Sequence, residues 1–246
     1  MNHLNKKWAV IVPMANEEHD FFPFVSAMQK QMEAIGNGVV FLIVDNVSKD
    51  KTLELCYQLS ENDKHFHTVF APENKNVVDA YIRGYKEALI KSDAEFIIEM
   101  DAGLSHDPIA LTTFLSKLNE GYECVYGSRF IDGGSMGDSP TNRQSLSKTG
   151  TVLSNLLLGT KLKDMTSGYQ GFHRNVVEKF TTYTLESKAH FYQTELRYLL
   201  RKYKSVEVPI HYRAPSPSVS KKAIINSIET LLYYFWRRIT FRSISL

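Results

Sequence analysis

The chain has 246 residues, of which 43% are hydrophobic and 23% charged, and its formal net charge is +2. These values argue against a disordered, collagen-like or disulfide-scaffold protein, and the near balance of charge argues against general nucleic-acid binding. The length predicts one large domain, alone or with a small appendage. Cys56 and Cys124 lie in apolar segments without a CxxC partner, which indicates buried, reduced thiols in a reducing compartment.

Short apolar runs alternate with amphipathic segments over the first 130 residues. Strands are expected at 8–12, 39–44, 68–70, 95–100 and 123–126, and helices at 19–35, 51–59, 77–90 and 109–118. Apolar strands that alternate with helices are typical of a parallel sheet covered on both faces. We therefore expect an α/β fold with a mostly parallel central sheet flanked by helices and a Rossmann-like N-terminal half.

The second half of the chain has a less regular pattern. Helices are expected at 143–158, 176–180, 193–203 and 221–241, a strand at 205–212, loops at 132–140 and 214–220, and an irregular segment at 163–172. The chain therefore divides into a main domain over 1–220 and a C-terminal helix over 221–246.

The C-terminal segment 221–246 differs from the rest of the chain in charge and composition. It contains five Lys or Arg against one Glu, a net charge of +4, and Tyr233, Tyr234 and Trp236 lie beside Arg237 and Arg238. Basic and aromatic residues on an amphipathic helix are typical of contact with a membrane surface. Packing on the body of the protein or in a homodimer is the alternative. No run of 18 apolar residues could span a bilayer, and segment 1–8 does not resemble a signal peptide.

Acidic residues follow the expected strands of the first half. Glu17, Asp45 and Asp101 come at or just after strand ends, and Asp79 opens a helix, where capping is an alternative role. The carboxyl ends of parallel strands lie at one edge of a sheet, so these side chains are expected to converge on one crevice. Such carboxylates can accept hydrogen bonds from a base or ribose, or hold a divalent cation against a diphosphate.

Basic residues supply the expected partners for phosphate. Arg129, Arg143, Arg213 and Lys221 lie in the second half of the chain. Arginine binds two phosphate oxygens with its fork of N–H donors. Each residue alone is equally consistent with ordinary surface charge, but the set indicates a crevice for a nucleotide diphosphate.

Motifs in a fixed order cover the chain from residue 8 to about 222. They are Pro13-x-x-Asn16-Glu17, Val44-Asp45-x-x-Ser48-x-Asp50-x-Thr52, Asp79-Ala80-Tyr81-x-x-Gly84, Met100-Asp101-Ala102-x-Leu104-Ser105-His106-x-Pro108, Gly127-Ser128-Arg129-Phe130, Asp164-x-Thr166-Ser167-Gly168-Tyr169-Gln170-x-Phe172, Gln193-x-Glu195, Val206-Glu207-Val208-Pro209-Ile210 and Ser220-Lys221. In these motifs the chain resembles glycosyltransferase family 2, which has the GT-A fold, and within it the dolichol-phosphate mannose synthase branch.

The resemblance implies a role for individual residues. Asp101 matches the first acid of the Asp-x-Asp motif, which binds Mg²⁺ or Mn²⁺ and the diphosphate, and Ser105 matches a further metal ligand in some relatives. Asp101, Arg129 and Arg143 are the implied catalytic residues. The implied substrate-binding residues are Pro13, Asn16, Glu17, Asp45, Asp79, Ala102, Gly103, Gln193, Glu195, Arg213 and Lys221. Pro13, Glu17 and Asp45 would contact the base and ribose, and Gln193 and Glu195 would lie on the acceptor side.

The chain departs from the family pattern at the metal motif. Gly103 stands where the family has the second acid of Asp-x-Asp, Ala15 replaces an aromatic residue, and Asp45-Asn46-Val47-Ser48 replaces Asp-Asp-Gly-Ser. These changes leave the fold intact but affect donor and metal binding. A catalytically silent nucleotide-binding subunit is therefore one alternative to an active enzyme.

The acceptor is inferred from the need for a base. Transfer to a sugar hydroxyl normally needs a general base, whereas a lipid phosphate is already anionic and needs cationic positioning. The surplus of arginines favours an inverting transfer to a dolichyl or undecaprenyl phosphate at the cytoplasmic face of a membrane. Asp164 or Glu195 could serve as a base, so a capsule or cell-wall saccharide is the alternative acceptor.

Overall fold

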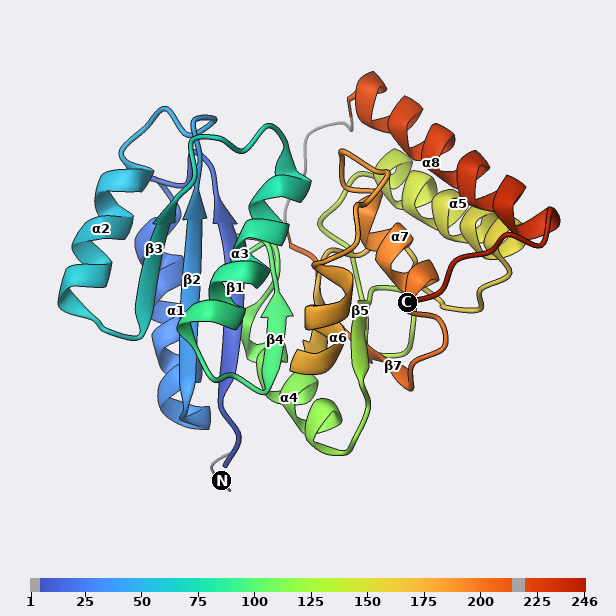
Figure 1. Ribbon diagram of the computed structural model, residues 1–246. Coiled ribbons are helices and arrows are strands. Elements are labelled where there is room, and N and C mark those ends of the chain that lie inside the picture. Colours follow the sequence, from blue (N-terminus) through green and yellow to red (C-terminus); the bar gives the residue numbers. More distant parts are fainter. Residues whose placement is uncertain (1–4, 214–219) are drawn as a thin grey trace.

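A seven-stranded sheet forms the centre of the computed structural model, which describes residues 5–213 and 220–246 (Figure 1). The strands are β1 (Trp8–Met14), β2 (Gly38–Val44), β3 (Phe66–Phe70), β4 (Phe96–Glu99), β5 (Cys124–Ser128), β6 (Gln170–His173) and β7 (Ser205–Pro209). Their order is β3-β2-β1-β4-β6-β5-β7, and β6 alone of these strands runs antiparallel to its neighbours. The expected α/β fold with a mostly parallel sheet is confirmed.

Helices cover both faces of the sheet. They are α1 (Phe21–Ile35), α2 (Thr52–Asn62), α3 (Val77–Lys91), α4 (Leu111–Asn119), α5 (Thr141–Leu158), α6 (Arg174–Phe180), α7 (Tyr192–Leu199) and α8 (Lys221–Ile239), with a short 3₁₀ helix, η1 (Pro108–Ala110), before α4. Along β1, Ala9 and Ile11 pack with α3, α6 and α7, while Val10 and Val12 pack with α1, α2 and α4. The two-residue period of a strand thus divides the core into two layers.

Strand β6 corrects one expectation. The segment 163–172 was expected to be irregular, but Gln170–His173 pairs with both β4 and β5 in the sheet. Its sequence is atypical of a strand because it contains Gly171 and a buried Gln170. A Cβ atom at Gly171 would lie 3.0 Å from Ile98, and the Gln170 side chain donates to Glu99. Close packing and a distant polar partner therefore explain a strand that local pattern does not reveal.

Several boundaries also differ from expectation. The strand expected over 205–212 ends at Pro209, and the helix expected over 193–203 ends at Leu199. Beyond β7, His211 and Tyr212 form only isolated bridges, to Ser135 and His106. The loop expected over 214–220 lies outside the described residues except for Ser220, as do residues 1–4 of the N-terminal segment.

The C-terminal helix α8 lies along α5 (Figure 1). Tyr234 on α8 donates to Glu195 on α7 over 2.6 Å, and Arg238 donates to the carbonyl of Leu157 over 2.9 Å. In the described ranges, no helix has the length and apolar character needed to cross a bilayer. The two cysteines are buried and free, as expected.

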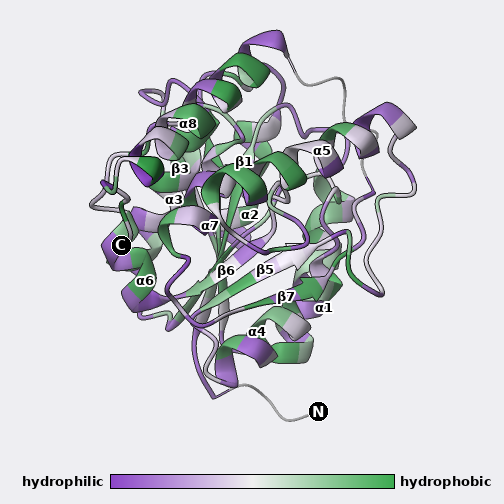
Figure 2. Ribbon diagram, turned by 90° about the vertical axis from the view of Figure 1, so that its right-hand side faces the viewer, coloured by the Kyte–Doolittle hydropathy of each residue, from purple (hydrophilic) through white to green (hydrophobic). Residues whose placement is uncertain are grey.

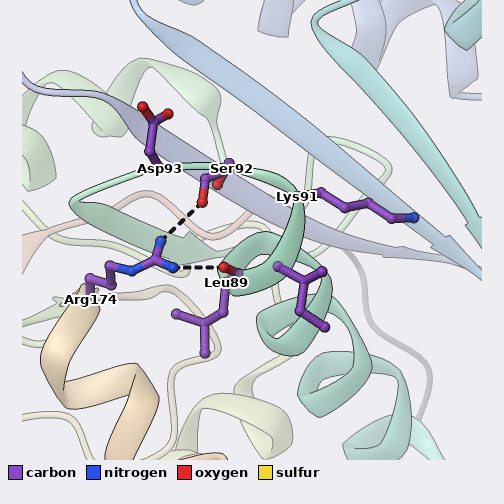
Figure 3. A pocket seen from close by; sticks show the side chains of 6 residues that line it. Leu89, Lys91, Ser92, Asp93 and Arg174 are labelled. Atoms are coloured by element: carbon purple, nitrogen blue, oxygen red, sulfur yellow. Dashed lines mark hydrogen bonds between the residues drawn. The ribbon is translucent and has the colours of Figure 1, made fainter.

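A hollow at the carboxyl end of α3 has a structural explanation (Figure 3). The Arg174 guanidinium donates to the carbonyls of Leu89 and Ser92 over 2.6 and 3.0 Å. These are carbonyls that the end of a helix leaves without intrahelical partners, and a cation there also complements the helix dipole. The hollow precedes β4 and therefore lies at the sheet edge opposite the strand-end acids.

Candidate active site

A cavity of about 680 Å³ opens beyond the carboxyl ends of β1 and β4. The predicted residues in its lining are Pro13, Glu17, Asp101, Ala102, Ser105, Arg129, Arg143 and Gln193. The other predicted residues, Asn16, Asp45, Asp79, Gly103, Glu195, Arg213 and Lys221, lie outside this lining. The cavity thus brings acids from the first half of the chain and arginines from the second half into one lining.

Glu17 and Asp101 form the acidic side of the cavity. Within the described residues they are the only carboxylates in its lining. Burial raises the pKa of Glu17 to about 7, and the charges of Asp20, Asp101 and Asp50 add to this. Burial also opposes ionisation of Asp101, but His106 and a hydrogen bond from Tyr81 outweigh it and hold the pKa below its ordinary value. Asp101 is therefore ionised at neutral pH, whereas Glu17 titrates close to neutral pH.

A tight loop after β4 orients Asp101. Gly103 and Leu104 both adopt positive φ, 64° and 60°, which turns the chain sharply. The Asp101 N–H donates to Nδ1 of His106 over 3.0 Å, and Tyr81 donates to Oδ1 of Asp101 over 2.6 Å. Burial lowers the pKa of His106, and Nδ1 of its ring is the acceptor of this hydrogen bond. The loop geometry therefore rests on His106 as well as on the glycine.

Arg129 and Asp164 form a buried ion pair behind the basic side. Arg129 donates from Nε to Oδ2 over 2.7 Å and from Nη2 to Oδ1 over 2.9 Å, and Nη2 also donates to Thr166. Burial opposes ionisation of Asp164, but the hydrogen bonds and charge of Arg129 lower its pKa. Both Asp164 oxygens are engaged, so this carboxylate is not free to act as a base.

Arg143, from the first turn of α5, lines the cavity. Its Nε is buried and has no hydrogen-bond partner in the described parts of the chain. Burial lowers the pKa of Arg143, and Tyr212 beside it opposes this shift. An unpaired buried N–H costs about 1–3 kcal/mol, which an anionic oxygen entering the cavity would remove.

Three predicted residues outside the cavity organise the turns around it. Asn16, at a φ of 58°, accepts the Lys49 N–H, and Asp45 accepts the Val47 N–H. Asp79 accepts the Lys75 N–H and a side-chain donor of Asn76, which in turn caps α3. Their contact with substrate stays a prediction.

Glu195 lies beneath the surface, outside the cavity lining. Its carboxylate accepts the N–H groups of Glu186 and Ser187 and the Tyr234 hydroxyl, and burial raises its pKa. It thereby joins α7 to α8.

Two predicted cations, Arg213 and Lys221, are not part of the cavity lining. Arg213 pairs with Asp107 over 2.7 Å, and Lys221 is exposed at the start of α8. Their contact with a phosphate stays a prediction.

The cavity lining also contains polar residues that sequence reasoning did not predict as site residues, among them Tyr81, His106, Lys188, His190 and Tyr212. Tyr81 and His106 fall within motifs that the sequence shows, so their positions could have been found. Lys188 and His190 lie between α6 and α7, where no pattern marked them.

The residues present fit a divalent cation that also binds the donor. No group of three or more His, Cys, Asp or Glu gathers within residues 5–213 and 220–246. Mg²⁺, however, is commonly bound by one or two carboxylates together with substrate phosphates. Asp101 and Glu17 supply two carboxylates on one side of the cavity, and Ser105 lies in the same lining.

Comparison with known proteins assigns the family. Residues 9–181 match the family model described as glycosyl transferase family 2, and the chain belongs to this family. The polyprenol monophosphomannose synthase of Mycolicibacterium smegmatis is 30% identical over 90% of this chain and 83% of its own. The undecaprenyl-phosphate mannosyltransferase of Micrococcus luteus is 29% identical over 70% of each chain. The protein is therefore a glycosyltransferase.

A solved structure confirms the fold. Glucosyl-3-phosphoglycerate synthase from Mycobacterium tuberculosis, solved with Mn²⁺, uridine diphosphate and phosphoglyceric acid, matches 93% of this chain and 78% of its own. The TM-score is 0.67 and the sequence identity 16%. The match confirms the expected GT-A architecture, and the bound groups belong to that protein.

Proposed function

We propose that the protein transfers a sugar, mannose by analogy with its relatives, from a nucleotide-diphosphate sugar to a polyprenyl phosphate, with inversion and with Mg²⁺ or Mn²⁺. One observation carries the proposal: Arg143 lines the same cavity as Asp101, and its Nε is buried and has no hydrogen-bond partner among the described residues. The names of the two curated relatives support a polyprenyl phosphate acceptor.

Neither of the two acids considered as a general base is free in this structure. Both residues considered for that role, Asp164 and Glu195, are fully engaged by hydrogen bonds. Deprotonating a sugar hydroxyl would need such a group, whereas a phosphate oxygen needs only orientation and charge. The acceptor class that fits is an anionic phosphate.

The proposed reaction assigns one task to each side of the cavity. Asp101 would help to hold a divalent cation, which would bind the donor diphosphate and neutralise charge on the leaving group. Arg143, with Arg129 behind it, orients the acceptor phosphate. A phosphate oxygen attacks the anomeric carbon opposite the diphosphate, the new C–O bond forms as the old one breaks, and nucleoside diphosphate leaves. No proton has to be removed from the acceptor.

The surface of α5 and α8 fits a membrane-bound acceptor. Exposed apolar side chains on or just after these helices are Leu146, Val152, Leu153, Leu156, Ile225, Ile228, Leu232, Trp236, Ile239 and Phe241. Figure 2 shows hydrophobic and hydrophilic residues alternating along both helices. Ser220 and Ala223, at the start of α8, line the cavity. We propose that this surface contacts the cytoplasmic face of a membrane and that 221–246 serves as the contact helix of a catalytic domain over 1–220.

Trp236→Glu is expected to weaken binding to vesicles of phosphatidylcholine and phosphatidylglycerol. Burying a large apolar side chain contributes about 1.5–3 kcal/mol, so the partition coefficient should fall about tenfold or more. Co-sedimentation with vesicles measures it. Ile90→Glu, at an exposed isoleucine on α3, is the matched control and should bind as the unaltered protein does. Equal binding by both variants, or a change in oligomeric state with Trp236→Glu alone, would identify α8 as a packing helix instead.

The acceptor class is tested by supplying GDP-mannose or UDP-glucose, with Mn²⁺, together with undecaprenyl phosphate or undecaprenol in detergent. We expect a lipid-linked sugar only from undecaprenyl phosphate, because its phosphate oxygen needs no general base, whereas the alcohol would need one and hydrogen bonds hold both Asp164 and Glu195. Turnover that needs a saccharide and ignores the lipid would select the saccharide acceptor. Nucleotide binding without turnover on any acceptor would select the silent subunit.

A further inference from the structure

Gly103 stands where the family has an acid, and the carboxylate of Glu17 lies beside it. Gly103 follows Asp101 by two residues at a φ of +64°. A Cβ atom built there would lie 2.7 Å from Oε2 of Glu17, so the end of the Glu17 side chain would have to move to admit one. Glu17 therefore puts a carboxylate where an acid at 103 would need room, and both Glu17 and Asp101 line the cavity.

The turn that carries Glu17 is fixed by the loop after β2. The Glu17 N–H donates to Oγ1 of Thr52 over 2.8 Å, and the Asn16 N–H donates to Oγ of Ser48 over 3.1 Å. Asp50 in turn accepts the hydroxyls of Thr52 and Ser48 over 2.6 and 3.1 Å. The backbone position of Glu17 is thus set by a hydrogen-bonded network, as a ligand position requires.

We propose that Glu17, with Asp101, supplies the two carboxylate ligands of the divalent cation, replacing the acid that relatives carry at position 103. The inference rests on the proposed function, because the donor diphosphate completes the coordination. It also assigns Glu17 a role other than contact with the base and ribose. The loss of an acid at 103 is then an exchange of ligands between the loop after β4 and the end of β1.

The test measures nucleotide binding by calorimetric titration, with and without metal, and does not depend on turnover. GDP and UDP are titrated into the protein with and without Mn²⁺, and Mn²⁺ alone is followed by its paramagnetic resonance signal. The variants are Glu17→Gln, Gly103→Asp and the double variant Glu17→Ala with Gly103→Asp. Glu18→Gln is the matched control, because Glu18 is the exposed neighbour and its side chain accepts the Lys51 N–H, a bond that the glutamine oxygen can also accept. Thermal unfolding confirms that each variant folds.

Glu17→Gln should lose the strengthening by Mn²⁺ and keep the metal-free affinity. Loss of groups that merely support metal ligands costs about 10–100-fold, so losing a ligand should cost at least tenfold. Gly103→Asp alone should also weaken the metal effect, because its carboxylate meets that of Glu17. The double variant should restore it, since aspartate tolerates positive φ and the space is then free.

Other outcomes overturn the inference. A metal effect that survives in Glu17→Gln, or an equal loss with and without Mn²⁺, would make Glu17 a nucleotide contact only. Nucleotide binding to the unaltered protein without any metal effect would also overturn it, while leaving the donor site intact. Binding of neither GDP nor UDP under any condition would instead remove the proposed function itself.

Discussion

Asp164→Ala is expected to lower the free energy of unfolding by about 3–5 kcal/mol. Arg129 and Asp164 pair with side chains that are 3% and 0% exposed. Removing the carboxylate leaves a buried guanidinium without its counter-charge, which costs more than the pair itself contributes. The N–H groups of Arg129 and Thr166 lose the same acceptor. Urea unfolding followed by circular dichroism measures the change.

A double-variant cycle separates the ion pair from general damage. Asp164→Ala combined with Arg129→Met should be less destabilised than the two single losses added together, because no unpaired charge remains. Asp138→Ala is the matched control, since Asp138 is exposed in the loop before α5 and should change stability by less than about 0.5 kcal/mol. A loss below about 1 kcal/mol for Asp164→Ala would show that the pair is solvated, and Asp164 would again be a candidate base.

The ion pair shows where sequence reasoning reached its limit. Asp164 and Glu195 looked available as bases because their partners are distant in the chain: Arg129 lies 35 residues before Asp164, and Tyr234 lies 39 residues after Glu195. A sequence shows which residues can ionise, but it does not show which hydrogen bonds occupy them. The fold shows that these two acids are not free to act as a general base. This supports the proposal of an acceptor that needs no base.

Hydrophobic periodicity and the residues at strand ends predicted the features that depend on local sequence. The apolar runs of β1 and β2 identified the parallel half of the sheet, and the strand-end acids Glu17 and Asp101 do meet in one cavity. Strand β6 was not predicted, because Gly171 and Gln170 are neither apolar nor β-branched, as residues of a central strand usually are. Lys188 and His190 were not predicted, because the segment between α6 and α7 that brings them to the cavity has no regular sequence pattern.

Asp101→Asn should reduce kcat/KM for sugar transfer by about 10²–10³-fold or more. The side chains of aspartate and asparagine have nearly the same size and shape. A loss of rate therefore reports the missing negative charge near the leaving diphosphate rather than altered packing. Removing one preorganised electrostatic group from an active site has effects of this size. Initial rates at varied donor concentration, with undecaprenyl phosphate fixed, measure the change.

Tyr81→Phe is expected to have a smaller effect than Asp101→Asn, because it removes the hydrogen bond to Asp101 but leaves the charge of the Asp101 carboxylate. A hydrogen bond to a charged group contributes about 1.5–3 kcal/mol, so a loss of about ten- to a hundredfold is expected. Asp107→Asn, at an acid that caps η1 and pairs with Arg213, is the matched control and should retain most of the rate. If Asp101→Asn were no worse than Asp107→Asn, the donor diphosphate would be neutralised by arginines alone. The acidic side of the cavity would then serve the base and ribose, as the sequence first suggested for Glu17.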